Sequence, residues 1–433
     1  MNDASDSPSA QTKFAQICES LFALRNEGSR YGLQRIQALA DALGNPEKQF
    51  PIIHVAGTNG KGSVCAMLEA LYRDNKYKTG LYNSPHLLHL GERIQVNRKP
   101  LDEAAIINWL ETIRPFAKTL QQSDPELQAS FFEYMTAMAF AQFARSKIDL
   151  AFIETGLGGR LDATNIVTPE LSIITSISLD HTDLLGETLT AIAREKGGII
   201  KPGKPVLLGK LPAEAEYELR NNAKERNSPI YTLIERFPDF EALPETNLHG
   251  TYQRYNAGLA LYASEIIAQK FPIKKTDALK SVDWAGRWQR IQMGDKTLIL
   301  DATHNPEGAE HLRKNLSQLT ESPIIIAGTL GLERGQSLVK AIAPFAKELF
   351  LVEPNQPRAV KSKTLKELLP ESFNKPVHSS TLKELFPSAG ECATGEKGSV
   401  IVVTGSIYLI GEVLARLQPT KANSDFQALQ DRI

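Results

Sequence analysis

An apolar segment, a glycine-rich turn and a helical segment follow one another directly, and this succession constrains the fold more than any other feature. Phe50–Ala56 (FPIIHVA) has the composition of a buried strand, and Val64–Asn75 has helical periodicity. Gly57–Ser63 (GTNGKGS) joins them. Glycines let the backbone turn so that its N–H groups point inward, and a helix start adds the positive end of its dipole. The segment predicts a phosphate-binding loop that opens an α/β domain.

The side chains of this loop suit a nucleotide. Lys61 can reach the β- and γ-phosphates, and the Ser63 hydroxyl can ligate Mg²⁺. The loop departs from G-x-x-x-x-G-K-[ST], because its first spacer is shorter and Gly62 separates Lys61 from Ser63. The alternative is a glycine-rich turn without a ligand, but the position between strand and helix favours nucleotide binding. His54, inside the apolar strand, is interpreted as a core residue.

Further short apolar runs alternate with helical stretches, which predicts βαβ units and a mostly parallel sheet. In the first part of the chain these runs are Asp149–Glu154, Leu171–Leu179 and Pro205–Gly209. A second set consists of Leu298–Asp301, Ile324–Gly328, Glu348–Val352 and Val400–Thr404. We therefore expect an α/β protein with an N-terminal P-loop-type, mostly parallel ATPase domain (1–290) and a smaller Rossmann-like C-terminal domain (296–433).

Composition narrows the class of protein. The formal net charge is -1, so no global field calls for nucleic acid or a membrane surface. The three cysteines, Cys18, Cys65 and Cys392, are widely separated, which suits a reducing compartment. Met1–Lys13 lacks the basic start and apolar stretch of a signal peptide, and no apolar run is long enough for a bilayer. We expect a cytoplasmic monomer with neither a nucleic acid nor a membrane as partner.

Several motifs together resemble the folylpolyglutamate synthase/dihydrofolate synthase family of the Mur ligase superfamily. The loop Gly57–Ser63 resembles the family's phosphate loop, and Glu154–Asn165 (ETGLGGRLDATN) is similar to its long signature. Further matching segments are Asn83–Leu87, Phe131–Glu133, Asp180–Thr182, Arg194–Gly198, Gly286–Gln289, Asp301–Pro306 and Gly405–Leu409. Thr303 stands where the family usually has alanine. Only 56 residues precede Gly57, too few for the UDP-sugar domain of a Mur ligase, so the folate branch is expected.

The resemblance implies an ATP site shared by the two domains. From the phosphate loop it assigns Asn59, Gly60, Lys61, Gly62 and Ser63, and from the rest of the chain Asn256, Arg287, Asp301 and His304. An aspartate at a strand end can accept hydrogen bonds from ribose hydroxyls, which gives the Asp301 assignment a physical basis. The alternatives are a domain-junction ion pair for Arg287, a turn for Asp301 and a helix cap for His304. Trp284 and Trp288 are interpreted as interdomain packing.

The resemblance also implies two Mg²⁺ ions. It assigns Ser84, Glu154 and His181 as ligands, and Lys196, as a carbamate, as the ligand of a second ion near the γ-phosphate. Ser63 of the loop is a further candidate ligand. Glu154 fits on physical grounds, because a carboxylate at the carboxyl end of a strand faces the expected crevice. Imidazole is a less usual Mg²⁺ ligand, so the assignment of His181 at the end of the next strand depends on the family. The alternatives are a cap or ion pair for Glu154 and a Ser-Pro turn for Ser84.

Lys196 is expected to carry a carbamate, because relatives carry a carboxylated lysine in the matching segment. Carbamylation needs a neutral amine and therefore a lowered pKa, and it would supply the anionic oxygen that a second Mg²⁺ requires. The alternative is an ordinary lysine that serves the C-terminal dipole of its helix before Gly197-Gly198. Lys61, Lys196 and His181 are the expected catalytic residues.

The pterin-side substrate is assigned to three segments by the same resemblance. The residues are Ser29, Arg30, Tyr31, Gly32, Ser130, Phe131, Phe132, Glu133, Leu161, Asp162 and Ala163. Ser29-Arg30-Tyr31 does not match the acidic segment of some members with two activities. Phe131 and Phe132 can stack on a flat ring or belong to the core, and the sequence leaves both open.

The implied activity is amide formation through an acyl phosphate, with L-glutamate joined to dihydropteroate, to a tetrahydrofolate glutamate, or to both. We expect the bifunctional enzyme. The alternatives are folylpolyglutamate synthesis alone and a Mur-type amino acid ligase. A nucleotide-binding switch protein is disfavoured, because Asn374-Lys375 is followed by Pro376 and Val377, so the aspartate of the N-K-x-D guanine motif is absent.

Overall fold

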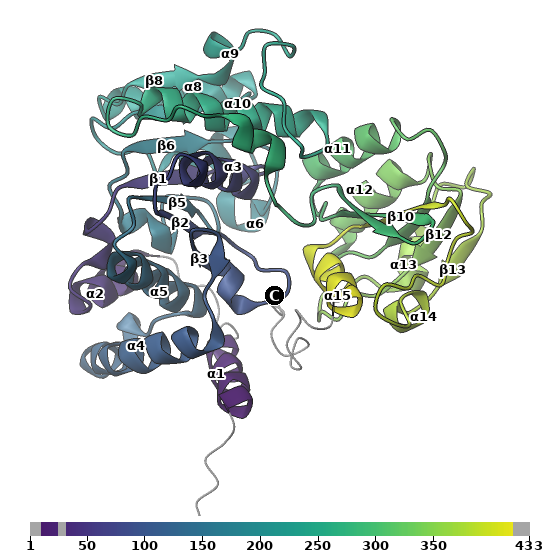
Figure 1. The fold of residues 1–433 in the computed structure, drawn as a ribbon, viewed down its shortest axis with the longest axis horizontal. Helices are drawn as coiled ribbons and strands as arrows, with labels where there is room; N and C mark the ends of the chain where they lie inside the picture. The colour runs from purple at the N-terminus through teal and green to yellow at the C-terminus, as the bar shows by residue number, and fades with distance from the viewer. Residues whose placement is uncertain (1–9, 25–31, 419–433) are drawn as a thin grey trace, which may run out of the picture.

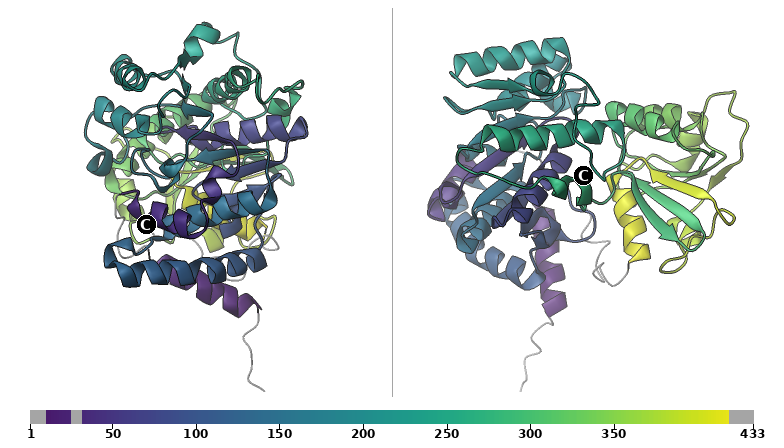
Figure 2. Two further views of the ribbon diagram at one scale, coloured as in Figure 1. Left: turned by 90° about the vertical axis from the view of Figure 1, so that its left-hand side faces the viewer. Right: turned by 45° about the horizontal axis from the view of Figure 1, so that its top comes forward.

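The computed structural model describes residues 10–24 and 32–418, and it forms two α/β bodies side by side (Figure 1). The larger one, from the first helix to residue 281, is called the N-terminal domain here, and the part from residue 289 onward the C-terminal domain. Figure 2 shows the same two bodies from two further directions. None of the described helices combines the length and apolar character that a bilayer crossing needs.

The N-terminal domain contains an eight-stranded sheet in the order β4-β3-β2-β5-β1-β6-β7-β8. Its strands are β1 Ile52–Ala56, β2 Thr79–Tyr82, β3 Ile94–Val96, β4 Lys99–Pro100, β5 Leu150–Glu154, β6 Leu171–Ile174, β7 Val206–Leu208 and β8 Ile230–Thr232. The pairs from β2 to β8 are parallel, and β3 and β4 add an antiparallel edge.

Helices cover both faces of this sheet, and the alternating side chains of β1 explain why. Ile53 and Val55 face the core beneath α3 and α10, whereas Ile52 and Ala56 face cores on the opposite side. The helices are α1 Ala10–Ala23, α2 Gln34–Ala42, α3 Lys61–Asp74, α4 Glu103–Ser123, α5 Phe131–Ser146, α6 Thr182–Leu185, α7 Leu189–Gly197, α8 Ala213–Glu225, α9 Leu233–Arg236 and α10 Thr251–Ile266. Short 3₁₀ segments are η1 Pro46–Lys48, η2 Leu90–Arg93, η3 Pro125–Leu127, η4 Ala163–Ile166 and η5 Asp277–Ser281.

The C-terminal domain is built on a six-stranded sheet in the order β13-β12-β11-β14-β10-β9. Its strands are β9 Gln289–Met293, β10 Lys296–Asp301, β11 Ile324–Ala327, β12 Glu348–Leu351, β13 Val377–Ser379 and β14 Val400–Thr404. All pairs are parallel except the β9–β10 hairpin. The helices are α11 Pro306–Leu316, α12 Leu332–Ile342, α13 Ser362–Glu367, α14 Leu382–Leu385 and α15 Ile407–Leu417. Figure 1 shows α11 and α15 on the side that faces the N-terminal domain.

The predicted α/β class and the two mostly parallel sheets are confirmed, but one predicted strand is too long. Leu171–Leu179 forms a strand only as far as Ile174. Beyond it, Thr175 Oγ1 donates to the Asn59 carbonyl (2.6 Å), and Asn59 N donates to Ser176 Oγ (3.0 Å). The segment after β6 therefore supports the phosphate loop instead of continuing the sheet. The second sheet begins at Gln289, because β9 pairs with β10.

Candidate active site

The loop Gly57–Ser63 connects β1 to α3, as the sequence predicts. Gly57 and Gly60 have φ angles of 151° and 85°, which L side chains rarely adopt. A Cβ on Gly57 would lie 1.9 Å from Thr175 Oγ1, so the loop could not pack against the segment after β6. Thr58 N donates to the Ser176 carbonyl (2.8 Å) and completes that support. The loop is therefore fixed by its neighbours, with α3 starting at Lys61.

Two lysines converge on this loop. Lys61 Nζ donates to the carbonyls of Gly57 (3.0 Å) and Thr58 (3.1 Å), and Lys196 Nζ donates to the same Gly57 carbonyl at 2.9 Å. Lys196 is in the last turn of α7 but is only 4% exposed. Burial first, and then the charge of Lys61, lowers the pKa of Lys196 from 10.5 to about 7. Lys196 thus points into the protein toward the phosphate loop.

Glu154 is the last residue of β5 and lies beside the loop. Its carboxylate is buried, and burial raises its pKa while the nearby Lys61 opposes that effect. Glu154 Oε2 accepts a hydrogen bond from Ser84 N at 3.3 Å, in the segment that follows β2. Ser63, at the start of α3, is buried and accepts from Gln253 Nε2 at 3.3 Å. A carboxylate and hydroxyl groups are the oxygen ligands that Mg²⁺ prefers.

His181 does not lie at the end of a strand, contrary to the expectation. β6 ends at Ile174, and His181 has the N-cap position of the short helix α6 with a φ of 49°. Its Nε2 lies 3.9 Å from Asp180 Oδ1. Burial lowers the pKa of His181, and the charges of Lys196 and Lys61 contribute in the same direction. Over residues 10–24 and 32–418, no three His, Cys, Asp or Glu side chains gather as a metal site.

A narrow cavity lies between the two domains and is lined by most of the residues that the sequence assigns to the nucleotide. Those lining it are Asn59, Gly60, Ser63, Arg287, Asp301 and His304. Asn256, on α10, is adjacent, because a Cβ on Gly60 would lie 2.5 Å from Asn256 Oδ1. Burial, followed by the charge of Arg287, lowers the pKa of His304 to about 4, so the ring is neutral near pH 7. His304 does not cap α11, since Asn305 is the capping residue.

Direct hydrogen bonds join the domains at this cavity. Glu307 Oε2, from the first turn of α11, accepts from Asn59 Nδ2 (2.6 Å) and Ser178 Oγ (3.0 Å). Asn305 Nδ2 donates to Asn59 Oδ1 and to Asp180 Oδ2, both at 3.1 Å. The C-terminal domain therefore contacts the phosphate loop itself and the segment that carries His181.

The structure places the described substrate-side residues around the start of α5 and the signature after β5. Ser130 caps α5, and Glu133 accepts from Ser130 N (2.7 Å) and pairs with Arg35 (3.0 Å). Phe131 is only 2% exposed and packs in the core, whereas Phe132 is half-buried beside Gly156.

Other predicted substrate residues have different surroundings. Asp162 accepts from Gly156 N and Leu157 N, both at 2.8 Å, and thereby shapes the turn after β5. Ala163 is buried, Leu161 is half-buried, and Gly32 has a φ of 142°. Ser29, Arg30 and Tyr31 lie outside the described residues.

Several residues of the cavity were not expected from the sequence. They are Tyr252, Thr303, Gly308, His311 and Leu312. Their spacing is the signal that could have found them. Gly308, His311 and Leu312 recur on the α11 face that follows His304, and Tyr252 precedes Asn256 by four residues on α10. The rings of Tyr252 and His311 lie 4.7 Å apart, which closes the cavity between α10 and α11.

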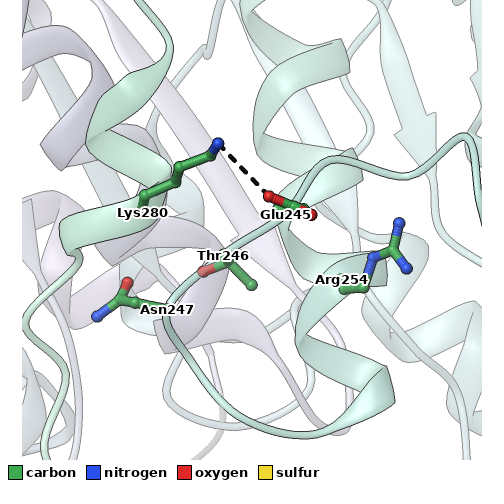
Figure 3. Close-up of a pocket in the computed structure, with 5 residues that line it drawn as sticks. All are labelled: Glu245, Thr246, Asn247, Arg254 and Lys280. Atoms are coloured by element: carbon green, nitrogen blue, oxygen red, sulfur yellow. Dashed lines mark ion pairs between the residues drawn. The ribbon is translucent and has the colours of Figure 1, made fainter.

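A second hollow lies on the surface of the N-terminal domain (Figure 3). Glu245, Thr246, Asn247, Arg254 and Lys280 line it, and none of them lines the interdomain cavity. Lys280 pairs with Glu245 at 3.4 Å, and both side chains are largely exposed. This hollow brings together none of the predicted site residues.

Comparison with known proteins identifies the family. The Mur ligase middle domain matches residues 55–256, and the Mur ligase glutamate ligase domain matches residues 286–407. The dihydrofolate synthase/folylpolyglutamate synthase of Bacillus subtilis is 33% identical over 420 residues, which span 90% of this chain and 96% of that protein. The chain belongs to the folylpolyglutamate synthase/dihydrofolate synthase family.

Solved structures of the family share the whole architecture. The folylpolyglutamate synthase of Mycobacterium tuberculosis complexed with ADP has a TM-score of 0.83 at 29% identity, covering 94% of this chain and 98% of that one. E. coli FolC in complex with DHPP and ADP has a TM-score of 0.82 at 27% identity, covering 96% and 100%. The predicted family is therefore confirmed.

Proposed function

We propose that this protein is an ATP-dependent ligase that joins L-glutamate to dihydropteroate and to the γ-carboxylate of tetrahydrofolate glutamates. The observation that carries the proposal is the convergence of Lys61, Lys196 and Glu154 on one phosphate loop at the domain boundary. Relatives named for one or both activities are similar over most of their length, and solved relatives are described as complexes with ADP.

ATP binds in the interdomain cavity in this proposal. Asn59, Gly60, Lys61, Gly62 and Ser63 hold the phosphates, while Asn256, Arg287, Asp301 and His304 hold the rest of the nucleotide from α10 and the C-terminal domain. The domains 1–290 and 296–433 therefore close on one nucleotide. The support is the lining of the cavity and the hydrogen bonds from Asn305 and Glu307 to Asn59.

Mg²⁺ fits the residues present. Glu154 provides a buried carboxylate that accepts from Ser84 N, and its Oε2 lies beside Gly62, the residue before Ser63. His181 lies near enough to Lys196 and Lys61 for their charges to lower its pKa. In the proposal, two ions are held by Ser84, Glu154, His181, Ser63 and a carbamate on Lys196. When bound, the ions neutralise phosphate charge as ATP is cleaved.

The chain's own residues orient the reaction. A carboxylate oxygen of the acceptor attacks the γ-phosphorus of ATP, ADP leaves, and an acyl phosphate forms. The amine of L-glutamate then attacks the acyl carbon, the C–O bond to phosphate breaks, and the amine loses a proton as the amide forms. Lys61 stabilises charge on the transferring phosphoryl group, and the packing of the two domains excludes water.

Carbamylation of Lys196 is supported by three features of its position. The side chain is buried, its amine lies 2.9 Å from the Gly57 carbonyl, and its pKa of about 7 leaves much of the amine neutral near pH 7.5. The neutral amine attacks CO₂, and loss of one proton gives the carbamate. A lysine that served only the helix dipole would be expected at the exposed end of α7, whereas Lys196 is buried against the phosphate loop.

The acceptor binds around the start of α5 and the turn after β5 in this proposal. Half-buried Phe132 can stack on a flat ring, while Phe131 is already part of the core. The remaining assigned residues are Ser29, Arg30, Tyr31, Gly32, Ser130, Glu133, Leu161, Asp162 and Ala163. We also propose that the protein is a cytoplasmic monomer.

Phosphate release tests the proposed function. Full-length protein is given ATP, Mg²⁺, L-glutamate and either dihydropteroate or tetrahydrofolate, with Lys61→Ala as the control. Release with both acceptors, dependent on glutamate and absent in the control, is expected. Release with tetrahydrofolate alone would restrict the enzyme to folylpolyglutamate synthesis, and release with neither acceptor would overturn the proposal.

A further inference from the structure

Trp284 lies where the phosphate loop departs from the general pattern. Gly62 stands between Lys61 and Ser63, and a Cβ built on it would lie 2.8 Å from Cζ2 of Trp284 and 3.1 Å from Oε2 of Glu154. Real Cβ atoms essentially never approach a heavy atom as closely as 2.8 Å, so an indole ring and a carboxylate fill the space that any side chain would need. The extra glycine of the loop is thus required by what packs on it.

Trp284 comes from the segment that connects the two domains. It lies between η5, the last element of the N-terminal domain, and β9, the first strand of the C-terminal domain. Its ring packs against the core beneath α3 and α10. A movement of this connecting segment therefore moves the ring relative to Gly62 and Glu154.

Arg98 holds Trp284 from the other direction. Arg98 and Asn97 form the two-residue turn between β3 and β4, with φ angles of 66° and 49°. The Arg98 guanidinium lies 5.1 Å from the Trp284 ring centroid and donates to the Asp283 carbonyl. A cation over the face of an indole is attracted by the negative charge of the ring face. The β3–β4 turn thereby fixes both the ring and the backbone next to it.

We propose that Trp284 is a positioning residue, held by Arg98, that fixes the phosphate loop at Gly62 against the carboxylate of Glu154. It couples the interdomain segment to the nucleotide site. The inference rests on the proposed function, because it assigns the loop to ATP. Trp288, four residues later, has a different role, since its ring is buried in the core of the C-terminal domain.

A double-mutant cycle on ADP affinity tests the contact with the ring. Gly62→Ala is expected to weaken ADP binding about tenfold or more, because its methyl group collides with the ring. In a chain that already carries Trp284→Ala, the same Gly62→Ala change is expected to weaken ADP binding less than about threefold. The difference between the two losses is a coupling of the size that contacting residues show. Equal losses in both backgrounds would overturn the proposal.

Trp109 provides the matched control for this cycle. It lies on α4, where Arg145 stacks over its ring at 4.3 Å. Trp109→Ala combined with Gly62→Ala must give additive losses, because Trp109 does not pack on the loop. If circular dichroism shows that Trp284→Ala does not fold, Trp284→Leu takes its place, because it also removes Cζ2.

Two further readouts separate positioning from a merely structural role. Trp284→Phe is expected to keep most ADP affinity but to lose the change in tryptophan fluorescence on ADP binding, whereas Trp109→Phe keeps that change. Arg98→Met is expected to raise the half-saturating Mg²⁺ concentration about threefold, and Arg145→Met to leave it unchanged. An unchanged Mg²⁺ titration in Arg98→Met, or a fluorescence change that survives in Trp284→Phe, would contradict the proposal.

The cycle needs neither folate nor glutamate, so the two proposals can fail separately. If the losses of ADP affinity are additive in a chain that binds ADP and ligates glutamate, the proposed role of Trp284 is refuted and the proposed ligase function stands. A cycle with strong coupling in a chain that ligates no glutamate to a folate would retain the positioning role and remove the proposed acceptors.

Discussion

Carbamylation of Lys196 can be tested through its pH dependence. Because burial and Lys61 lower the amine pKa to about 7, about three quarters of the amine is neutral at about pH 7.5. For a lysine at the ordinary value of 10.5, the neutral fraction is about one in a thousand. CO₂ reacts with the neutral amine, and the neutral fraction of Lys196 at that pH is roughly 750 times that of an ordinary lysine.

The assay is ¹³C NMR of the full chain under ¹³CO₂ at constant dissolved CO₂. We expect a protein carbamate signal that rises through about pH 7 and is much weaker in Lys196→Met. Lys201→Met is the matched control, since the pKa of Lys201 is also lowered, to about 8, but its Nζ donates to the Asn165 carbonyl and not to the phosphate loop, where the Mg²⁺ that would hold a carbamate is proposed. The control is expected to keep the signal.

Activity should follow the modification. Lys196→Met is expected to lose activity about 100-fold or more, the size of effect seen when one group that stabilises a transition state is removed. Acetate, which supplies a carboxylate of similar size, is expected to restore part of it. Two results would refute the reasoning. One is a carbamate signal in Lys196→Met as strong as in the chain that keeps Lys196, and the other is a signal that appears only toward pH 10.

Three further substitutions test separate parts of the site. Lys61→Ala should lower the rate of ATP turnover about 100-fold or more while the melting temperature changes little; a near-normal kcat in a colorimetric phosphate assay would contradict the role of Lys61. Glu154→Gln keeps the shape but removes the charge, so half-saturation by Mg²⁺ should move about tenfold higher, and an unchanged titration would make Glu154 purely structural. Asp301→Ala should weaken ATP binding by calorimetry severalfold, because Asp301 lines the cavity from the C-terminal domain; unchanged affinity would place the nucleotide in the N-terminal domain alone.

The sequence predicts the fold where local pattern and tertiary structure agree. The apolar run before Gly57 is a strand because both faces of β1 are buried. The apolar run Leu171–Leu179 was predicted as one strand, but Thr175 and Ser176 hydrogen-bond to Asn59 and the strand ends at Ile174. The β2–β4 edge was not predicted, because its strands are only four, three and two residues long.

The site shows the same division between local and long-range information. The positions of Gly57, Lys61 and Glu154 could be predicted, because they depend on where β1 and β5 end. Trp284 and Glu307 could not be assigned to the loop, because their contacts with it depend on how the C-terminal domain and its connecting segment pack. No local spacing carries that information.

The burial of individual residues could not be predicted from the sequence either. Phe131 and Phe132 are chemically equivalent in the sequence, yet only Phe132 keeps an exposed face. The helical turn decides this, since adjacent residues on α5 point about 100° apart. The start and rotation of that helix are fixed by the Ser130 cap and its partner Glu133.

The most direct test of ligation through an acyl phosphate uses oxygen transfer. Dihydropteroate or tetrahydrofolate labelled with ¹⁸O in the acceptor carboxylate is incubated with the full-length protein, ATP, Mg²⁺ and L-glutamate. Inorganic phosphate and the folate product are then analysed by mass spectrometry. The C–O bond to phosphate breaks when glutamate attacks, so one ¹⁸O should appear in phosphate for the first glutamyl residue added to each labelled acceptor, with the other retained in the amide. Later additions use the carboxylate of an unlabelled glutamate and release unlabelled phosphate, so the assay is stopped after the first addition. Glutamylated product with unlabelled phosphate, or phosphate released with no glutamyl product, would contradict the assignment.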